Sequence, residues 1–339
     1  MAITRSSGCN LTHCASGSVA FLFVIKYADD TVLLCDSEDG MKQALVALNL
    51  YCTEWRLKLN CNKTKIIVFS RGRQNLSNYE FDFDGENTEV VGEYKYLGML
   101  FNYNGRFRKG ELELKEAATR AMYALISKCR KFDLPVDIQL ELFNATVLPI
   151  LTYASEIWGY HISRELEHMY MKFLKQVLGV HKNTSNDMVY GELGVFPLDI
   201  YIKCKMIGYW SRLISGKNTK LCFIMYQCLL QLDRSGLYTS PWLACIKNIC
   251  NGCGFSGMWL LQEFPNTKWV KKAVEQRLKD QWLATWHHNL DTRSLCANYR
   301  MFKNVFGMEE YIRKLTKGDR ILVAKFRTCN NRLPVNVGR

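Results

Sequence analysis

The sequence of 339 residues contains no long apolar run. The longest uninterrupted apolar run near its start covers residues 19–25, which is too short to cross a bilayer, and no small-residue cleavage site follows it. An internal repeat and a low-complexity segment are absent as well. These absences argue against transmembrane, secreted and repeat proteins. We therefore expect an intracellular protein, nuclear or cytoplasmic, without a membrane partner.

The 14 cysteines lack the regular spacing of a disulfide framework, and many lie inside apolar stretches. This pattern favours free thiols in a reducing compartment. Cys250 and Cys253 have the spacing of zinc ligands, and Cys245, His287 and His288 could complete a site. The gap to the histidines is longer than in the usual zinc finger, so we favour free thiols over zinc.

Acidic residues are too few to balance the basic ones: 32 against 45, which gives a net charge of +13. Such an excess favours a polyanionic partner such as nucleic acid. The composition is otherwise that of an ordinary globular protein, with 48% hydrophobic and 23% charged residues. The chain is long enough for two domains with a sizeable core.

The pattern of apolar residues predicts an α+β fold. Residues 1–17 are rich in Ser, Thr, Gly and Asn without periodicity, which predicts a disordered N-terminus. Apolar runs on both sides of "YADD" predict two buried strands joined by a tight turn. Residues 36–60 predict one amphipathic helix. Two strands within residues 57–70, and three more within residues 79–107, would complete a small antiparallel sheet.

Helical periodicity dominates after this sheet. Acidic residues begin and basic residues end the stretch 111–132, in agreement with the helix dipole. Pro135 can start the next helix, whereas Pro149 must kink or end it. A further helix is expected from a Ser163 cap to Gly179. The sequence therefore predicts a sheet with one helix, followed by a mostly α-helical region.

Asp29 and Asp30 stand at the tip of the predicted hairpin, in a turn without the Gly or Asn-Gly that a relaxed two-residue loop prefers. Two adjacent carboxylates cannot be buried unpaired, because desolvating each costs several kcal/mol. A hard divalent cation would neutralise them, since Mg²⁺ takes one or two carboxylates together with substrate phosphates. The alternative for a bare Asp-Asp pair is a solvent-exposed acidic turn.

Several segments resemble a known family. "YADDTVLL", "LNCNKTKIIVFSR" and "YKYLGMLFNYNGRF" are similar, in order and spacing, to the palm of reverse transcriptases from animal non-LTR retrotransposons. "VLPILTYASEIWGY" and "LVAKFRTCNNRLPVNVGR" resemble the thumb and C-terminal region. Retroviral enzymes and group II intron maturases share the Tyr-x-Asp-Asp box. The "YKYLG" hairpin and the long helical tail instead indicate the LINE-type, jockey-like lineage.

This resemblance implies a division of the chain. Residues 18–107 would form a partial palm, residues 108–180 a helical thumb and residues 181–339 a helical C-terminal region. The implied activity is RNA-directed DNA polymerase, a nucleotidyltransferase. The implied partners are an RNA template, a DNA primer and deoxynucleotides.

The resemblance also implies roles for single residues. Asp29 corresponds to the metal-binding aspartate, with Asp30 its less strictly required neighbour and Tyr27 beside the primer terminus. In the two-metal scheme, Mg²⁺, which Mn²⁺ could replace, activates the primer 3′-hydroxyl and steadies the leaving pyrophosphate. Lys63 or Lys65 falls where the family has a lysine that neutralises this pyrophosphate. The alternative for both lysines is a solvated basic turn.

A second hairpin corresponds to the primer grip of the family. Tyr96, Leu97 and Gly98 lie in this hairpin, and the resemblance assigns them to nucleic-acid binding. Without the resemblance, "YKYLG" would be read as an ordinary strand, because most aromatic alternations in strands belong to the core.

The sequence departs from the family pattern at its front. Residues 1–28 contain no Asp or Glu, although the family has another metal-binding aspartate and nucleotide-binding fingers upstream. Asp36, Glu38 and Asp39 follow the hairpin too closely to replace it. The Cys/His cluster that often follows "LPVNVGR" in the family is also missing. We therefore expect the isolated chain to be a truncated and inactive polymerase. The alternatives are a non-catalytic nucleic-acid-binding remnant or a translated relic without a role.

Overall fold

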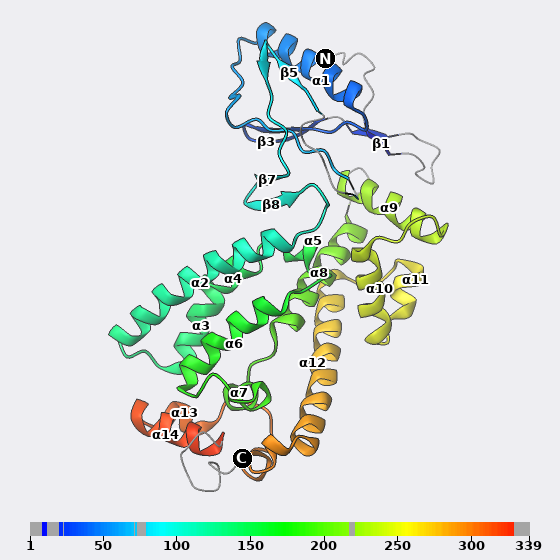
Figure 1. The fold of residues 1–339 in the computed structure, drawn as a ribbon. Coiled ribbons are helices and arrows are strands. Elements are labelled where there is room, and N and C mark those ends of the chain that lie inside the picture. Colours follow the sequence, from blue (N-terminus) through cyan, green and yellow to red (C-terminus); the bar gives the residue numbers. More distant parts are fainter. Residues whose placement is uncertain are drawn as a thin grey trace. The chain divides into compact units, whose positions relative to one another are not determined.

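The computed structural model describes residues 9–11, 20–22, 24–70, 72, 79–216 and 221–328 (Figure 1). The chain forms two compact units. The first combines Met1–Gly110 with Gly216–Leu243, and the second combines Glu111–Ser215 with Ala244–Arg339. Helices from both sides of residue 180 belong to the second unit.

Among its described residues, the first unit contains four antiparallel strand pairs. The pairs are β1 (Cys9–Leu11) with β2 (Ala20–Leu22), β3 (Val24–Tyr27) with β4 (Asp30–Leu33), β5 (Asp82–Phe83) with β6 (Glu86–Asn87), and β7 (Glu93–Tyr96) with β8 (Met99–Asn102). These pairs, together with the many helices, confirm the predicted α+β class. Within the described residues, the predicted small antiparallel sheet takes the form of separate two-stranded ladders.

Two further strand predictions differ from the structure. Cys9–Leu11, inside the segment expected to be disordered, forms β1. The other residues of the segment 1–17 lie outside the described part. Residues 57–70 form no strand, and Ile66 makes only an isolated parallel bridge to Val90. Its two backbone hydrogen bonds go to Glu89 and Val91, and the ladder does not continue beyond them.

Helix α1 (Glu38–Glu54) provides the apolar face of the first unit. The Ser37 hydroxyl caps it by accepting a hydrogen bond from the Gly40 N–H at 3.1 Å, and Glu38 and Asp39 complement the helix dipole. The helix packs against β5 and against the chain segments that precede β5 and β7. The buried residues of this core are Leu45, Cys52, Ile66, Phe81 and Phe83.

The second unit is helical. Its elements are α2 (Arg108–Lys131, which begins at the boundary), α3 (Val136–Thr146), α4 (Leu148–Leu151), α5 (Ser155–Trp158), α6 (Arg164–Leu178), α7 (Asn186–Leu193), α8 (Leu198–Ser215), α10 (Pro241–Gly252, which crosses the boundary), α11 (Ser256–Leu261), α12 (Thr267–Thr292), the 3₁₀ turns Ser294–Cys296 and Tyr299–Met301, α13 (Glu310–Lys314) and α14 (Lys317–Arg327). Helix α9 (Leu221–Arg234) belongs to the first unit.

The predicted helix boundaries are largely confirmed. Pro135 is the N-cap of α3. This helix ends before Val147, and Pro149 lies in the first turn of the next helix, α4. Gly179 ends α6 with a φ of +76°. Ser163 stands at the N-cap of α6, but its side chain does not cap the helix. None of the described helices is both long and apolar enough to span a bilayer.

Helix α12 packs along α8 and joins the C-terminal elements to the rest of the second unit (Figure 1). Trp286 of α12 is 1% exposed, and its indole donates to the Asp187 carbonyl of α7 at 2.8 Å. Phe143 of α3 stacks on Phe173 of α6 with ring centroids 4.1 Å apart. The core of this unit therefore combines segments 99 residues apart.

A buried ion network also joins distant segments of the second unit. Glu192, in the last turn of α7, has a fully buried side chain. Arg327 of α14 donates from Nε to both oxygens of Glu192 at 3.0 and 3.1 Å, and Tyr311 of α13 donates at 2.5 Å. Arg327 also pairs with Glu309 at 3.1 Å, and Lys303 pairs with Glu309 in turn. The network fixes α13 and α14 to α7.

Candidate active site

The Tyr-Ala-Asp-Asp segment forms the tip of the β3–β4 hairpin. Tyr27 pairs with Asp30 in the ladder, so Ala28 and Asp29 form a two-residue loop. Ala28 has a φ of +53°, a left-handed conformation that costs a non-glycine residue about 1–2 kcal/mol. This confirms the predicted tight turn, and strain of this kind is typical of functional sites.

Both aspartates of the tip are exposed, and neither forms an ion pair with another described residue. The strands behind them are less buried than predicted: Ile25 is 36% exposed and Tyr27 is 64% exposed. Two adjacent carboxylates without a cationic partner fit a hard divalent cation, which prefers oxygen ligands and can take the remaining ones from phosphates and water. Asp29 and Asp30 are the residues of the hairpin that could hold it.

The second predicted hairpin has a related loop. Leu97 and Gly98 connect β7 to β8 with φ values of +47° and +81°. Both residues of the β5–β6 loop, Asp84 and Gly85, also have positive φ values, but Asp and Gly suit this conformation. Leucine does not suit it. Strained first loop residues, Ala28 and Leu97, thus occur in the two hairpins to which the resemblance assigns a function.

Tyr96 is only half-buried as a residue, but its hydroxyl is buried and finds no hydrogen-bond partner among the described residues. The Tyr96 ring lies against Phe101, with centroids 6.5 Å apart. The side chain is therefore turned into its own hairpin. The exposed groups of this loop are Leu97 and the Gly98 backbone.

The two candidate lysines differ in their surroundings. The Lys65 ammonium forms an ion pair with Glu89 at 2.6 Å. Lys63 is exposed, and its ammonium has no ion-pair partner within the described part of the chain. Its backbone carbonyl accepts a hydrogen bond from the Tyr94 hydroxyl at 2.8 Å. Lys63 is therefore the better candidate for contact with an anion.

The structure brings some of the predicted residues together. The Tyr94 hydrogen bond joins the Asn60–Lys63 turn to the β7–β8 hairpin. The β3–β4 hairpin is tied to α1, because the Lys26 ammonium lies 5.2 Å from the centroid of the Tyr51 ring. No described hydrogen bond or ion pair joins Asp29 or Asp30 to Lys63. Sequence reasoning missed Tyr94 and Glu89; their spacing within the strand-like runs gave no signal of these contacts.

The cysteines considered for zinc lie in the second unit. Cys250 and Cys253 are buried in and directly after α10, whereas His287 and His288 belong to α12. Burial raises the pKa of Cys250 to about 12 and also raises that of Cys253. Among the described residues, no group of three or more His, Cys, Asp or Glu side chains is arranged to hold a metal ion.

Comparison with known proteins gives matches on the first unit and beyond. Residues 10–101 match the family described as reverse transcriptase (RNA-dependent DNA polymerase). An uncharacterised transposon-derived protein of Caenorhabditis elegans is 26% identical over 181 residues, which cover 52% of this chain and 60% of that protein. A Drosophila melanogaster protein named as a probable RNA-directed DNA polymerase from transposon BS is 27% identical over 161 residues, which cover 44% of this chain and 17% of that protein.

The matched part of the chain thus spans less than two thirds of either relative. No solved structure matches the chain significantly. The family match includes the β3–β4 hairpin with Asp29 and Asp30 as well as the β7–β8 hairpin up to Phe101. Residues 10–101 are thus similar to reverse transcriptases, and about half of the chain is similar to transposon-derived proteins.

Proposed function

We propose that the chain is the palm, thumb and C-terminal part of an RNA-directed DNA polymerase from a LINE-type, jockey-like retrotransposon. Its substrates would be deoxynucleotides, a DNA primer and an RNA template. One observation carries the proposal: two exposed carboxylates, which form no ion pair with any residue that the structure describes, stand on a strained hairpin inside the segment that matches the reverse transcriptase family.

In this proposal, Asp29 and Asp30 would hold divalent metal, with Mg²⁺ as the expected ion. When bound, the metal lowers the pKa of the primer 3′-hydroxyl and neutralises charge on the pyrophosphate. Tyr27, which is 64% exposed beside the tip, presents an aromatic face to the primer terminus. Lys63 would neutralise phosphate oxygens, because its ammonium is not engaged by a described carboxylate. Leu97 and the Gly98 backbone would contact the primer strand.

The resemblance assigns a further carboxylate to this site. Within the described ranges, no third acidic, histidine or cysteine side chain joins Asp29 and Asp30. Two carboxylates hold Mg²⁺ weakly without phosphate ligands, because the ion keeps several waters and needs a near-octahedral shell. We therefore propose that the isolated chain binds metal weakly and synthesises little or no DNA.

Metal binding at the tip can be tested with Mn²⁺. We expect paramagnetic broadening of the amide signals of residues 27–31 at millimolar Mn²⁺, and its loss in the Asp29→Asn, Asp30→Asn double variant, because the two carboxylates supply the ligands. Asp36→Asn is the matched control, since Asp36 is an exposed aspartate just after the hairpin. NMR of the ¹⁵N-labelled chain measures the effect.

Primer extension on an RNA template, with the same samples, tests the proposed lack of synthesis. If the chain synthesises DNA and Asp29→Ala abolishes the synthesis, the proposed inactivity is wrong, but the proposed polymerase function stands. If Mn²⁺ broadens the Asp36→Asn and the double variant equally, the hairpin is not a metal site and the polymerase proposal fails.

A second candidate function is non-catalytic nucleic-acid binding, which the net charge of +13 favours. The expected result is affinity for an RNA–DNA duplex that falls steeply with salt and does not change in Asp29→Ala, because phosphate contacts release counterions. Fluorescence anisotropy between about 50 and 200 mM salt, a range over which binding through several phosphates weakens by orders of magnitude, measures both. Affinity that is independent of salt would rule this function out.

A further inference from the structure

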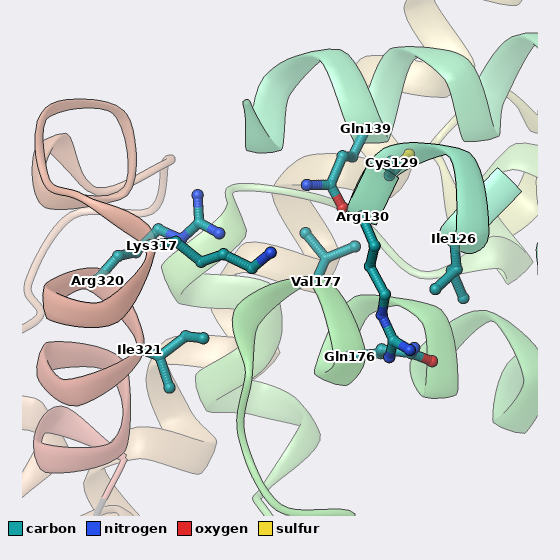
Figure 2. A pocket seen from close by; sticks show the side chains of 9 residues that line it. All are labelled: Ile126, Cys129, Arg130, Gln139, Gln176, Val177, Lys317, Arg320 and Ile321. Atoms are coloured by element: carbon teal, nitrogen blue, oxygen red, sulfur yellow. The ribbon is translucent and has the colours of Figure 1, made fainter. Parts of the chain in front are cut away.

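A small hollow in the second unit is lined by more basic than acidic side chains. It lies between α14 and the helices α2, α3 and α6, and it has a volume of about 60 Å³ (Figure 2). Its lining residues are Ile126, Cys129, Arg130, Gln139, Gln176, Val177, Lys317, Arg320 and Ile321. All of them belong to one compact unit, so the hollow is part of its fold.

Arg320 is the unusual residue of this hollow. It is only 7% exposed, and its Nε is buried without a hydrogen-bond acceptor among the described residues. Burial lowers the pKa of its guanidinium, although Asp133 opposes this. A buried cation without a bonded counter-charge costs several kcal/mol, so such groups are normally paired. The guanidinium therefore has donor capacity that the protein itself leaves unused.

Other polar groups point toward the same space. Figure 2 shows Lys317 and Arg320 extending from α14 toward α2, α3 and α6, with the Arg130 guanidinium beside the amide of Gln176. The Lys317 Nζ lies 3.2 Å from the Asp133 Oδ1, and both side chains are at least 49% exposed. An exposed pair of this kind contributes little stability, so Lys317 is free to turn to another anion. Lys317 and Arg320 thus share one nearby carboxylate, that of Asp133.

The chemistry and size of the hollow select its ligand. The Arg320 Nε is out of reach of a water-sized group, so a ligand would pair with the terminal guanidinium nitrogens, whose planar fork suits the oxygens of a phosphate. A buried water needs about 10–15 Å³, so a hollow of about 60 Å³ has room for roughly four to six water-sized groups. This matches the five non-hydrogen atoms of one phosphate group. A nucleobase would be too large.

We propose that this hollow binds one backbone phosphate of a polynucleotide through Arg320, Lys317 and Arg130. The site is separate from the Asp29 hairpin in sequence and uses no metal. The inference rests on the proposed nucleic-acid function only for the source of the phosphate. The unsatisfied guanidinium sets the chemical class independently of it.

The first test follows the Arg320 side chain directly. We expect the Arg320 Nε–Hε NMR signal, assigned by its loss in Arg320→Gln, to shift on addition of the single-stranded oligonucleotide dT₁₅. Inorganic phosphate should shift it only at much higher concentration, and dT₁₅ with an uncharged methylphosphonate backbone should leave it unmoved. A signal that responds to inorganic phosphate but not to dT₁₅ would overturn the polynucleotide as ligand. A signal that responds to neither would overturn the site.

The second test measures affinity. We expect Lys317→Gln and Arg320→Gln each to weaken dT₁₅ binding at least about fivefold and to reduce the slope of log affinity against log salt by about 0.7, the value for one lost contact with a single strand. Lys325→Gln, an exposed lysine of the same helix, is the matched control and should change the affinity less than twofold. Lys317 is exposed, so its replacement keeps the test valid if Arg320→Gln does not fold.

Equal effects of Lys317→Gln and Lys325→Gln would show general electrostatics and overturn the site. The Mn²⁺ experiment on the Asp29 hairpin is independent of these outcomes. The phosphate site and the polymerase proposal can therefore fail separately.

Discussion

Replacing Glu192 by alanine is expected to lower the free energy of unfolding of the second unit by about 3–5 kcal/mol, which is typical when one partner of a buried ion pair is removed. The carboxylate is fully buried and accepts hydrogen bonds from Arg327 Nε and from the Tyr311 hydroxyl. Without this carboxylate, both donors stay buried and lose their acceptor. Among the described residues, Arg327 then keeps Glu309 as its charged partner. Chemical denaturation followed by tryptophan fluorescence measures the loss.

Two variants make this result specific. Glu192→Gln keeps the shape and one acceptor oxygen, so we expect a smaller loss than with alanine. Glu310→Gln is the control, because the ion pair of Glu310 with Lys314 is exposed on both sides and such pairs contribute little. A loss for Glu192→Ala no larger than that of Glu310→Gln would contradict the role of the network.

Sequence patterns predicted the local elements of this protein well. The tight turn at Asp29, the helix capped by Ser37 and the helix break near Pro149 depend on neighbouring residues only. The strands expected between residues 57 and 70 failed for a different reason. The apolar run from Ile66 to Phe69 is typical of a buried strand, but a strand also needs a partner, and within this run only Ile66 forms a β-bridge.

The candidate site was predictable to the same extent. Asp29 and Asp30 could be identified from their position in a hairpin, since two charges between apolar runs need an explanation. The choice between Lys63 and Lys65 could not be made, because it depends on Glu89, 24 residues after Lys65. The unpaired Arg320 is likewise visible only when α14 is placed against α2 and α6. The sequence shows which polar groups are present, whereas distant residues decide whether each group finds a hydrogen-bond or ion-pair partner.

Gly194 illustrates the same limit, and its close contacts lead to a second prediction with a large expected effect. Gly194 ends α7 with a φ of +64°, and its N–H donates to the Tyr190 carbonyl. A Cβ at this position would lie 2.4 Å from the Met308 backbone nitrogen and 2.7 Å from the Gly307 carbonyl carbon. Both neighbours are backbone atoms in a segment held by the bridge between Leu193 and Met308, so neither can move aside without breaking it.

Gly194→Ala is therefore expected to destabilise the second unit by more than the cost of the left-handed conformation alone, which is about 1–2 kcal/mol. Overpacking adds typically about 1–3 kcal/mol. Gly254→Ala is the matched control, because Gly254 has a φ of +80° but nothing within 4 Å of its added Cβ. The difference between the two variants in denaturant unfolding isolates the clash with residues 307–308. Equal losses would show that this segment yields, and that the close approach at Gly194 does not hold the C-terminal elements in place.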